Sequence, residues 1–151
     1  MPYKILVMYD SRTGNTQKLA EAVAEGINQV PEATAELKRT EDITPDVAAE
    51  ADGYAIGSPS HFGIMSGRIL TLMTDLYCVR DKMAGKPMAI FTTGTGGQVN
   101  ALENLEKVVG SFNPEWIKPG TVVESEPQEA DKKQAMKMGK RLGQSAAKQT
   151  K

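Results

Sequence analysis

Cysteine, histidine and long apolar runs are all scarce in this 151-residue sequence, and each scarcity excludes a class of protein. Cys78 is the single cysteine, so no internal disulfide can form, which agrees with a reducing cytoplasm. His61 is the single histidine, and without clustered cysteines it cannot build a metal site. No apolar run approaches the roughly 20 residues that span a bilayer, and the N-terminal run ends at Asp10, unlike a signal peptide. We therefore expect a cytoplasmic protein that does not enter a membrane.

Charge of one sign is not in excess either. The sequence has 18 Lys and Arg against 19 Asp and Glu, spread along the chain, and its formal net charge is -1. This distribution lacks the basic patch of a nucleic-acid-binding protein, so no nucleic-acid partner is expected. The hydrophobic fraction of 40% is ordinary for a globular protein of this length. We predict a single domain over residues 1–151 with a hydrophobic core of its own.

The stretch from Ile5 to Gln17 organises the chain. Its five apolar residues, 5–9, predict a strand buried on both faces, and a helical pattern begins after the polar loop 11–16. The start of a helix offers backbone N–H groups without intrahelical partners and a dipole that favours anions. The loop adds hydroxyl and amide groups and one charge, from Ser11, Arg12, Thr13, Asn15 and Thr16.

The composition of this loop narrows the choice of anion. A Walker A loop is excluded because no Lys precedes Thr16, and a dinucleotide motif is excluded because Gly14 stands alone. The loop therefore suits a terminal phosphate monoester bound without metal. The alternative is an ordinary strand-to-helix turn in which Thr or Asn caps the helix.

Strand and helix patterns alternate along the whole chain. Further strands are predicted at residues 34–38, 54–57, 88–91 and 121–123, and helices near 45–51, 65–76, 102–109 and 127–142. Five such alternations predict an α/β fold, a parallel sheet with helices on both faces and right-handed crossovers. Residues 34–38 alternate polar and apolar side chains, so the second strand is expected at an edge of the sheet.

The loop Ser11-Arg12-Thr13-Gly14-Asn15-Thr16 resembles the phosphate loop of the flavodoxin family, whose pattern is Ser/Thr-x-Thr-Gly-x-Thr. Residues 57–67 and 91–98 resemble further loops of that superfamily, closest to its WrbA-type quinone reductases. The resemblance covers nearly the whole chain. It implies a flavodoxin-like doubly wound sheet of five parallel strands in the order 2-1-3-4-5, with the ligand at the switch point between strands one and three.

The resemblance also implies that FMN is the cofactor and that three loops bind it. The first loop, residues 11–16 including Gly14, would take the phosphate. The second and third would hold the flavin ring through small residues that let backbone N–H groups approach it. The second loop comprises Ser58, Pro59, Ser60, His61, Phe62 and Gly63; the third comprises Thr92, Thr93, Gly94, Thr95, Gly96 and Gly97.

Four single residues have competing interpretations. Phe62 either lies against the flavin ring or belongs to the core, and His61 either places a charge beside the reduced flavin or is a solvated loop residue. Cys78 falls on the helix that carries Met73 and Leu76, where packing is expected over a chemical role. Trp116 either contacts a partner or, as we expect, is packed before the last strand.

Three functions are compatible with the sequence. The first is an FMN electron carrier that exchanges electrons with a reductase and an acceptor protein. The second is a self-sufficient NAD(P)H:quinone oxidoreductase, favoured by the lack of an aromatic residue in loop 92–98, which leaves one ring face open. The third is a signalling domain of the same fold without a flavin, disfavoured because Asp10 is the only part of an acidic receiver site present. The oligomeric state is left open.

Overall fold

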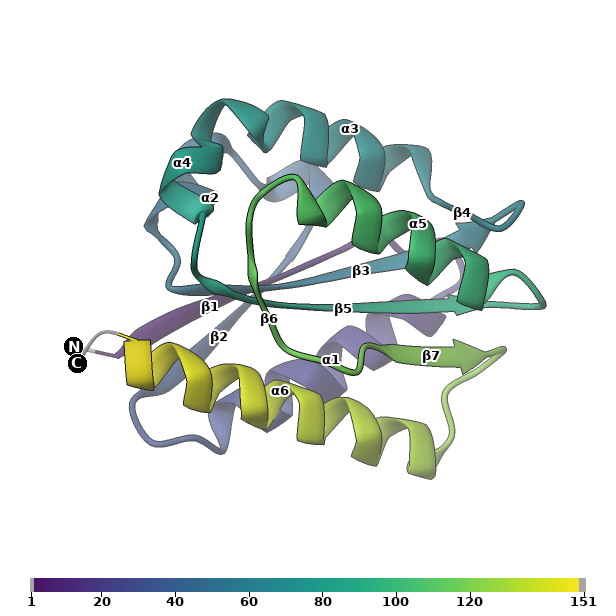
Figure 1. Ribbon diagram of the computed structural model, residues 1–151. Coiled ribbons are helices and arrows are strands. Elements are labelled where there is room, and N and C mark those ends of the chain that lie inside the picture. Colours follow the sequence, from purple (N-terminus) through teal and green to yellow (C-terminus); the bar gives the residue numbers. More distant parts are fainter. Residues whose placement is uncertain (1, 150–151) are drawn as a thin grey trace.

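The computed structural model describes residues 2–149, and its centre is a twisted parallel sheet (Figure 1). The strands hydrogen-bond in the order β2-β1-β3-β5, and both β6 and β7 pair with β5. This is the predicted order 2-1-3-4-5, with β2 at the edge as its alternation requires. The parallel strands are β1 (Tyr3–Tyr9), β2 (Ala33–Arg39), β3 (Gly53–His61), β5 (Pro87–Gly94), β6 (Glu115–Trp116) and β7 (Thr121–Glu124).

The sheet differs from the prediction in two places. The fifth strand is broken, because β6 pairs with residues 87–88 of β5 and β7 with residues 91–94, and a segment with a cis Lys118–Pro119 bond lies between them. The polar stretch 58–61, predicted as a loop, continues β3 and turns back into the antiparallel strand β4 (Ile64–Met65). The sheet therefore has seven strands among the described residues rather than five.

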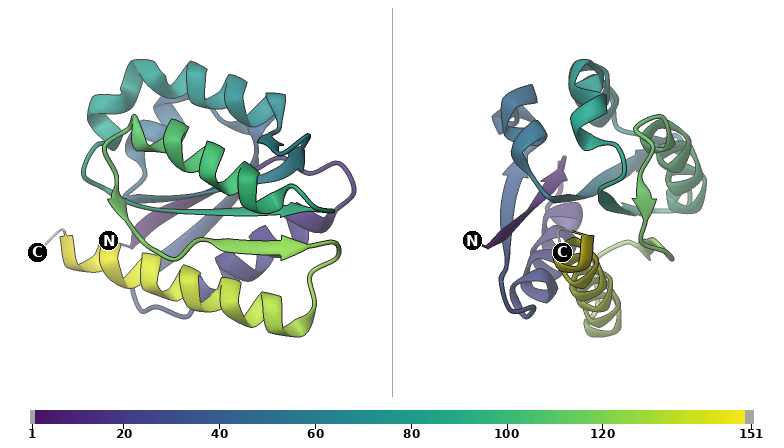
Figure 2. Two further views of the ribbon diagram at one scale, coloured as in Figure 1. Left: turned by 45° about the vertical axis from the view of Figure 1, so that its right-hand side comes forward. Right: turned by 60° about the vertical axis from the view of Figure 1, so that its left-hand side comes forward.

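Helices cover both faces of the sheet (Figure 2). One face carries α1 (Asn15–Asn28) and α6 (Glu129–Gln149). The other carries α2 (Pro45–Glu50), α3 (Gly67–Leu76), α4 (Arg80–Met83) and α5 (Gln98–Gly110), with the 3-10 turns η1 (Thr40–Asp42) and η2 (Tyr77–Val79). The Thr44 side chain accepts a hydrogen bond from the Val47 amide at 3.3 Å and so forms the predicted cap of α2.

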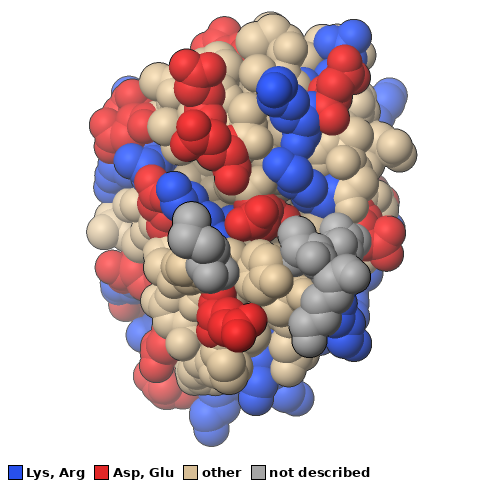
Figure 3. Space-filling view, turned by 90° about the vertical axis from the view of Figure 1, so that its left-hand side faces the viewer, with Lys and Arg blue, Asp and Glu red and all other residues tan. Residues whose placement is uncertain are grey.

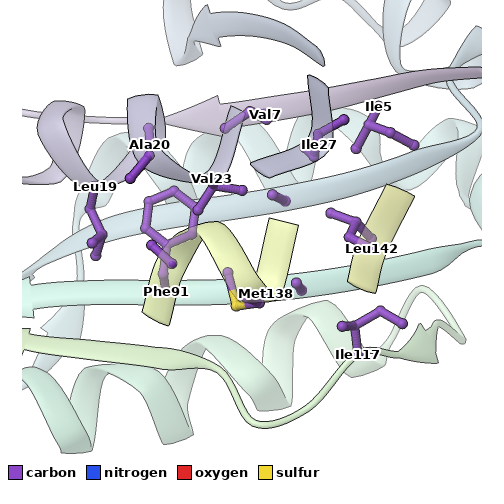
Figure 4. Packing of buried hydrophobic residues seen from close by; sticks show 14 of the residues in the cluster. Ile5, Val7, Leu19, Ala20, Val23, Ile27, Phe91, Ile117, Met138 and Leu142 are labelled. Carbon is purple, nitrogen blue, oxygen red and sulfur yellow. The ribbon is translucent and has the colours of Figure 1, made fainter. Parts of the chain in front are cut away.

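Alternation along β1 divides the buried side chains into two cores. Ile5 and Val7 face α1 and α6, whereas Leu6 and Met8 face α3 and α5. Figure 4 shows the first core, in which Phe91 from the sheet meets side chains of both helices. Both faces of β1 are thus buried, which explains its continuous apolar run.

Two single-residue expectations have different outcomes. Trp116 is partly buried and packs against the core beneath α3 and α5, as expected. Cys78 lies in η2 and is exposed, so the expectation that it packs is wrong: the α3 helix ends at Leu76, and the tighter 3-10 turn points the thiol outward. None of the helices within residues 2–149 combines the length and hydropathy needed to cross a lipid bilayer.

Helices α1 and α6 approach each other through two glycines. A Cβ atom at Gly26 would overlap the Met136 carbonyl oxygen, and one at Gly139 would overlap the Val23 carbonyl oxygen. Because these obstacles are backbone atoms, they cannot rotate away, and any side chain at either position separates the helices.

We predict that Gly139→Ala lowers the free energy of unfolding by about 1–3 kcal/mol, as overpacking does in other cores. Urea unfolding followed by circular dichroism measures the change. Gly110→Ala is the matched control, since nothing lies within 4 Å of a Cβ there and the residue is helical; it should stabilise by about 0.4–1 kcal/mol. Equal responses of the two variants would contradict the close helix contact.

Candidate functional site

The polar loops after β1, β3 and β5 meet at the carboxyl ends of three neighbouring strands, the right-hand end of the sheet in Figure 1. The strands are in register there, because Tyr9 pairs with Gly57 and Pro59 pairs with Thr93. The chain leaves β1 toward α1 on one face and β3 toward α3 on the other. A crevice therefore opens between the first two loops, which is the switch point of a doubly wound sheet.

The first loop is shaped around one hydroxyl group. The Ser11 Oγ accepts hydrogen bonds from the Gly14 amide at 3.1 Å and the Gln17 amide at 3.3 Å, and Gly14 adopts φ 96° at the start of α1. Within residues 2–149, the amides of Thr13, Asn15 and Thr16 find no acceptor. Free N–H groups at a helix start fit an anion, so the loop has the kind of donors that a phosphate needs.

The first and third loops are joined by a buried hydrogen bond. Thr16 Oγ1 and Thr93 Oγ1 lie 2.8 Å apart, and both residues are almost fully buried. Thr92 donates to the Gln98 carbonyl at 2.7 Å, and the Gln98 side chain accepts from the Gly96 amide at 2.8 Å. These threonines therefore hold the loops in place, while Thr95 and Gly96 form the exposed tip of the third loop.

The second and third loops touch each other. A Cβ atom at Gly97 would lie 2.8 Å from the Ser60 Oγ and 2.9 Å from the Gly63 Cα, so only glycine permits this approach. The Met65 amide, at the end of the β3–β4 hairpin, donates to the Asn104 side chain of α5 at 3.1 Å. The hairpin and the third loop therefore present one continuous surface.

Phe62 is fully exposed at the tip of this hairpin, with φ 58°. The interpretation of Phe62 as a core residue is wrong, because the turn between β3 and β4 points its ring into solvent. Ile64 of the hairpin and Val99 of α5 are also exposed apolar side chains. A large exposed ring on a built hairpin is available to stack on a flat ligand.

The remaining residues of the second loop have other positions. Ser58 is buried, and its Oγ accepts from the Ser66 amide at 2.9 Å and donates to the Pro59 carbonyl at 2.7 Å, which ties β3 to the start of α3. His61 is half-buried and lines, with Arg12, a groove of about 930 Å³ beside α3.

Two supports of the first loop were not predicted from the sequence. Arg39, at the end of β2, donates to the Ser11 carbonyl at 3.2 Å and to the Gln17 side chain at 2.9 Å, and its guanidinium lies 5.3 Å from the centre of the Tyr9 ring. After β7, Glu126 pairs with Lys18 of α1, and the hydrogen bond from Lys18 lowers the pKa of the Glu126 carboxyl. Neither residue lies near its partner in sequence, so no local pattern marks them.

Together these features define a doubly wound α/β protein with a hydroxyl-rich loop and a helix start at its switch point. A family model described as a flavodoxin domain matches residues 6–113. A flavodoxin of Aquifex aeolicus is 30% identical over 161 aligned residues, which cover 93% of this chain and 85% of that protein. The chain belongs to the flavodoxin family, a family of flavoproteins that transfer electrons.

Other similar proteins include both flavodoxins and quinone reductases, the two groups whose loops this sequence resembles. An NAD(P)H dehydrogenase (quinone) of Geobacter sulfurreducens is 31% identical, over 65% of this chain and 63% of that protein. An archaeal flavodoxin structure matches with a TM-score of 0.86 at 21% identity, over 95% of this chain and 99% of that one. A WrbA-like flavodoxin structure from Agrobacterium tumefaciens matches with a TM-score of 0.82 at 25% identity, over 97% and 98%.

We predict that Thr93→Val lowers the free energy of unfolding by about 1–3 kcal/mol, because it leaves the buried Thr16 hydroxyl without a partner. Removing both hydroxyls in Thr16→Val/Thr93→Val should lose clearly less than the sum of the single losses. Urea unfolding of the wild type, the two single variants and the double variant, all without ligand, completes this double-mutant cycle. Single losses that add up would show that the two loops are not coupled by this bond.

Proposed function

We propose that the chain binds FMN and carries electrons between a reductase and an acceptor protein. The observation that carries the proposal is the set of amides on Thr13, Asn15 and Thr16, at the start of α1, that have no acceptor among the described residues. A terminal phosphate monoester supplies acceptors for all of them and meets the positive end of the helix dipole. Bound FMN would supply the redox chemistry, which no amino-acid side chain of this site provides.

The accessible candidate residues would contact different parts of FMN. Arg12, Thr13 and Asn15 would contact the phosphate, and the hairpin residues Ser60, Phe62 and Gly63 would lie along the ribityl chain and ring. The tip of the third loop, at Thr95, Gly96 and Gly97, would offer small residues to the edge of the ring. Since the hairpin and third loop touch, the ring would lie against their common outer surface rather than between their backbones.

The chain's own groups have three tasks in this proposal. The first loop binds and orients, and its hydrogen bonds to Ser11 and Arg39 hold it ready before the ligand arrives. The exposed Phe62 ring covers apolar ligand surface. The exposed side chains of Phe62, Ile64 and Val99 would then form the apolar part of a docking surface for redox partners.

We predict that the wild type binds FMN much more tightly than riboflavin, because only FMN has the phosphate. Thr13→Ala should weaken FMN about tenfold, the loss of one hydrogen bond to a charged group, and should leave riboflavin affinity unchanged. Quenching of flavin fluorescence measures both constants. Thr34→Ala, an exposed threonine on β2, is the matched control. Equal affinity of the wild type for the two flavins would show that the first loop does not bind phosphate.

A second candidate function is a self-sufficient NAD(P)H:quinone oxidoreductase. It is favoured by the absence of an aromatic residue in loop 92–98 and by the relative from Geobacter sulfurreducens. The two functions differ in whether a partner reductase is required.

If the chain is an electron carrier, the FMN-loaded protein should oxidise NADH or NADPH with benzoquinone no faster than an equal concentration of free FMN. Addition of a flavodoxin reductase with NADPH should then restore electron flow. The oxidation of the nucleotide, followed at 340 nm, measures both rates. Sustained turnover by the protein alone would replace the first function with the second.

A further inference from the structure

The last helix, α6, differs in charge from the rest of the chain. Although Lys and Arg occur along the whole sequence, residues 132–149 carry six of them and no Asp or Glu, whereas residues 1–131 carry 11 against 19 Asp and Glu. The near-neutral net charge therefore combines a basic helix with an acidic remainder. In Figure 1 this helix lies along one face of the sheet, next to β7.

The basic side chains in the middle of α6 are available to a partner. Lys133, Lys137 and Lys140 are exposed, and within the described part of the chain none of them makes an ion pair or a side-chain hydrogen bond. Glu129, at the start of the helix, pairs with Lys132 instead, at 4.0 Å. The positive charge further along the helix is therefore free to attract acidic groups from outside the protein.

A pocket of about 520 Å³ lies between α6 and the segment that joins β6 to β7. Pro119 and Met138 give it an apolar lining. Thr121 adds little polarity, because it is only 1% exposed and its hydroxyl donates to the Met138 sulfur at 3.4 Å. The pocket therefore offers an apolar surface beside the basic part of the helix.

Three cations border this pocket at intervals of one helical turn. They are Lys133, Lys137 and Arg141, at positions i, i+4 and i+8 on one face of α6. The Arg141 guanidinium donates to the Lys118 carbonyl, which holds it beside the pocket. An apolar cavity bordered by cations suits an apolar side chain that is flanked by carboxylates.

The same surface lacks the groups that bind a lipid bilayer or a nucleic acid. The large exposed apolar side chains of the described residues all belong to other elements: Leu37, Phe62, Ile64, Leu70, Tyr77 and Val99. Among the described residues, α6 therefore has no large apolar side chain to insert into a membrane. No aromatic ring lines the pocket, so a nucleic-acid base would have nothing to stack on.

We propose that the basic face of α6, formed by Lys133, Lys137, Lys140 and Arg141, docks an acidic segment of a partner protein. One apolar side chain of that segment would enter the pocket, and its carboxylates would meet the cations on the border. Charge complementarity determines the acidic character of the partner, and the cavity determines the apolar anchor. The surface includes none of the residues proposed to bind FMN, so the docking does not depend on the proposed function.

Fluorescence anisotropy with labelled peptides tests the proposal. The probe is a peptide with a central Phe flanked on both sides by Glu residues; a second peptide has Ser in place of Phe, and a third has Lys in place of Glu. The Phe peptide should bind, and more weakly as salt is raised from about 50 mM to about 200 mM. The Ser peptide should bind about tenfold more weakly, because the apolar anchor is lost, and the Lys peptide should not bind.

Two double variants with the same loss of charge locate the surface. Lys133→Gln/Lys137→Gln should weaken the Phe peptide about fivefold, since two opposite charges are lost. The matched control is Lys82→Gln/Lys107→Gln, in exposed lysines of α4 and α5 away from the pocket, which should bind like the wild type. Equal affinities are expected with and without FMN, so a failure of FMN binding would leave this test intact.

The proposal is overturned if the Phe peptide does not bind, if the Phe and Ser peptides bind equally, or if the two double variants bind alike. A requirement for FMN would also overturn it, because the peptide would then lie on the flavin surface. Self-association in sedimentation velocity that Lys133→Gln/Lys137→Gln abolishes would replace the partner with a second copy of this chain. Tighter binding to phosphatidylserine vesicles or double-stranded DNA than to the Phe peptide, lost in the same variant, would assign the face to a membrane or a nucleic acid.

Discussion

The direction in which the chain leaves β1 and β3 is the constraint on which the site depends. Parallel strands bring every outgoing loop to one end of the sheet, but the loop after β1 turns toward α1 and the loop after β3 toward α3. A crevice must open where the two loops diverge. On the opposite side of the molecule, seen in Figure 3, basic and acidic side chains intermingle.

The loops around the crevice are held by hydrogen bonds made before any ligand is present. Ser11 closes the first loop, Thr16 joins it to Thr93, and Gln98 closes the third loop. Glycine at position 97 brings the hairpin against that loop. Ordering these segments in advance reduces the conformational entropy lost on binding, so more of the contact energy is available for affinity.

Much of this arrangement was predictable, because each part has a local cause. The apolar run of β1, the alternation of β2 and the cap at Thr44 led to the right elements and the right strand order. The split of the fifth strand, the β4 strand and the exposure of Cys78 were not predicted. Each depends on a two- to four-residue segment, in which the local pattern is too short to outweigh tertiary contacts.

The sequence by itself determined the α/β class, the buried central strand and the hydroxyl-rich loop at the start of a helix, since these follow from side-chain period and from the chemistry of helix ends. Only the tertiary structure decided which polar side chains face a ligand. Thr16, Ser58, Thr92 and Thr93 are buried and hydrogen-bonded within the protein, whereas Phe62 is exposed. These outcomes depend on residues up to 77 positions apart, such as Thr16 and Thr93, and no local pattern contains that information.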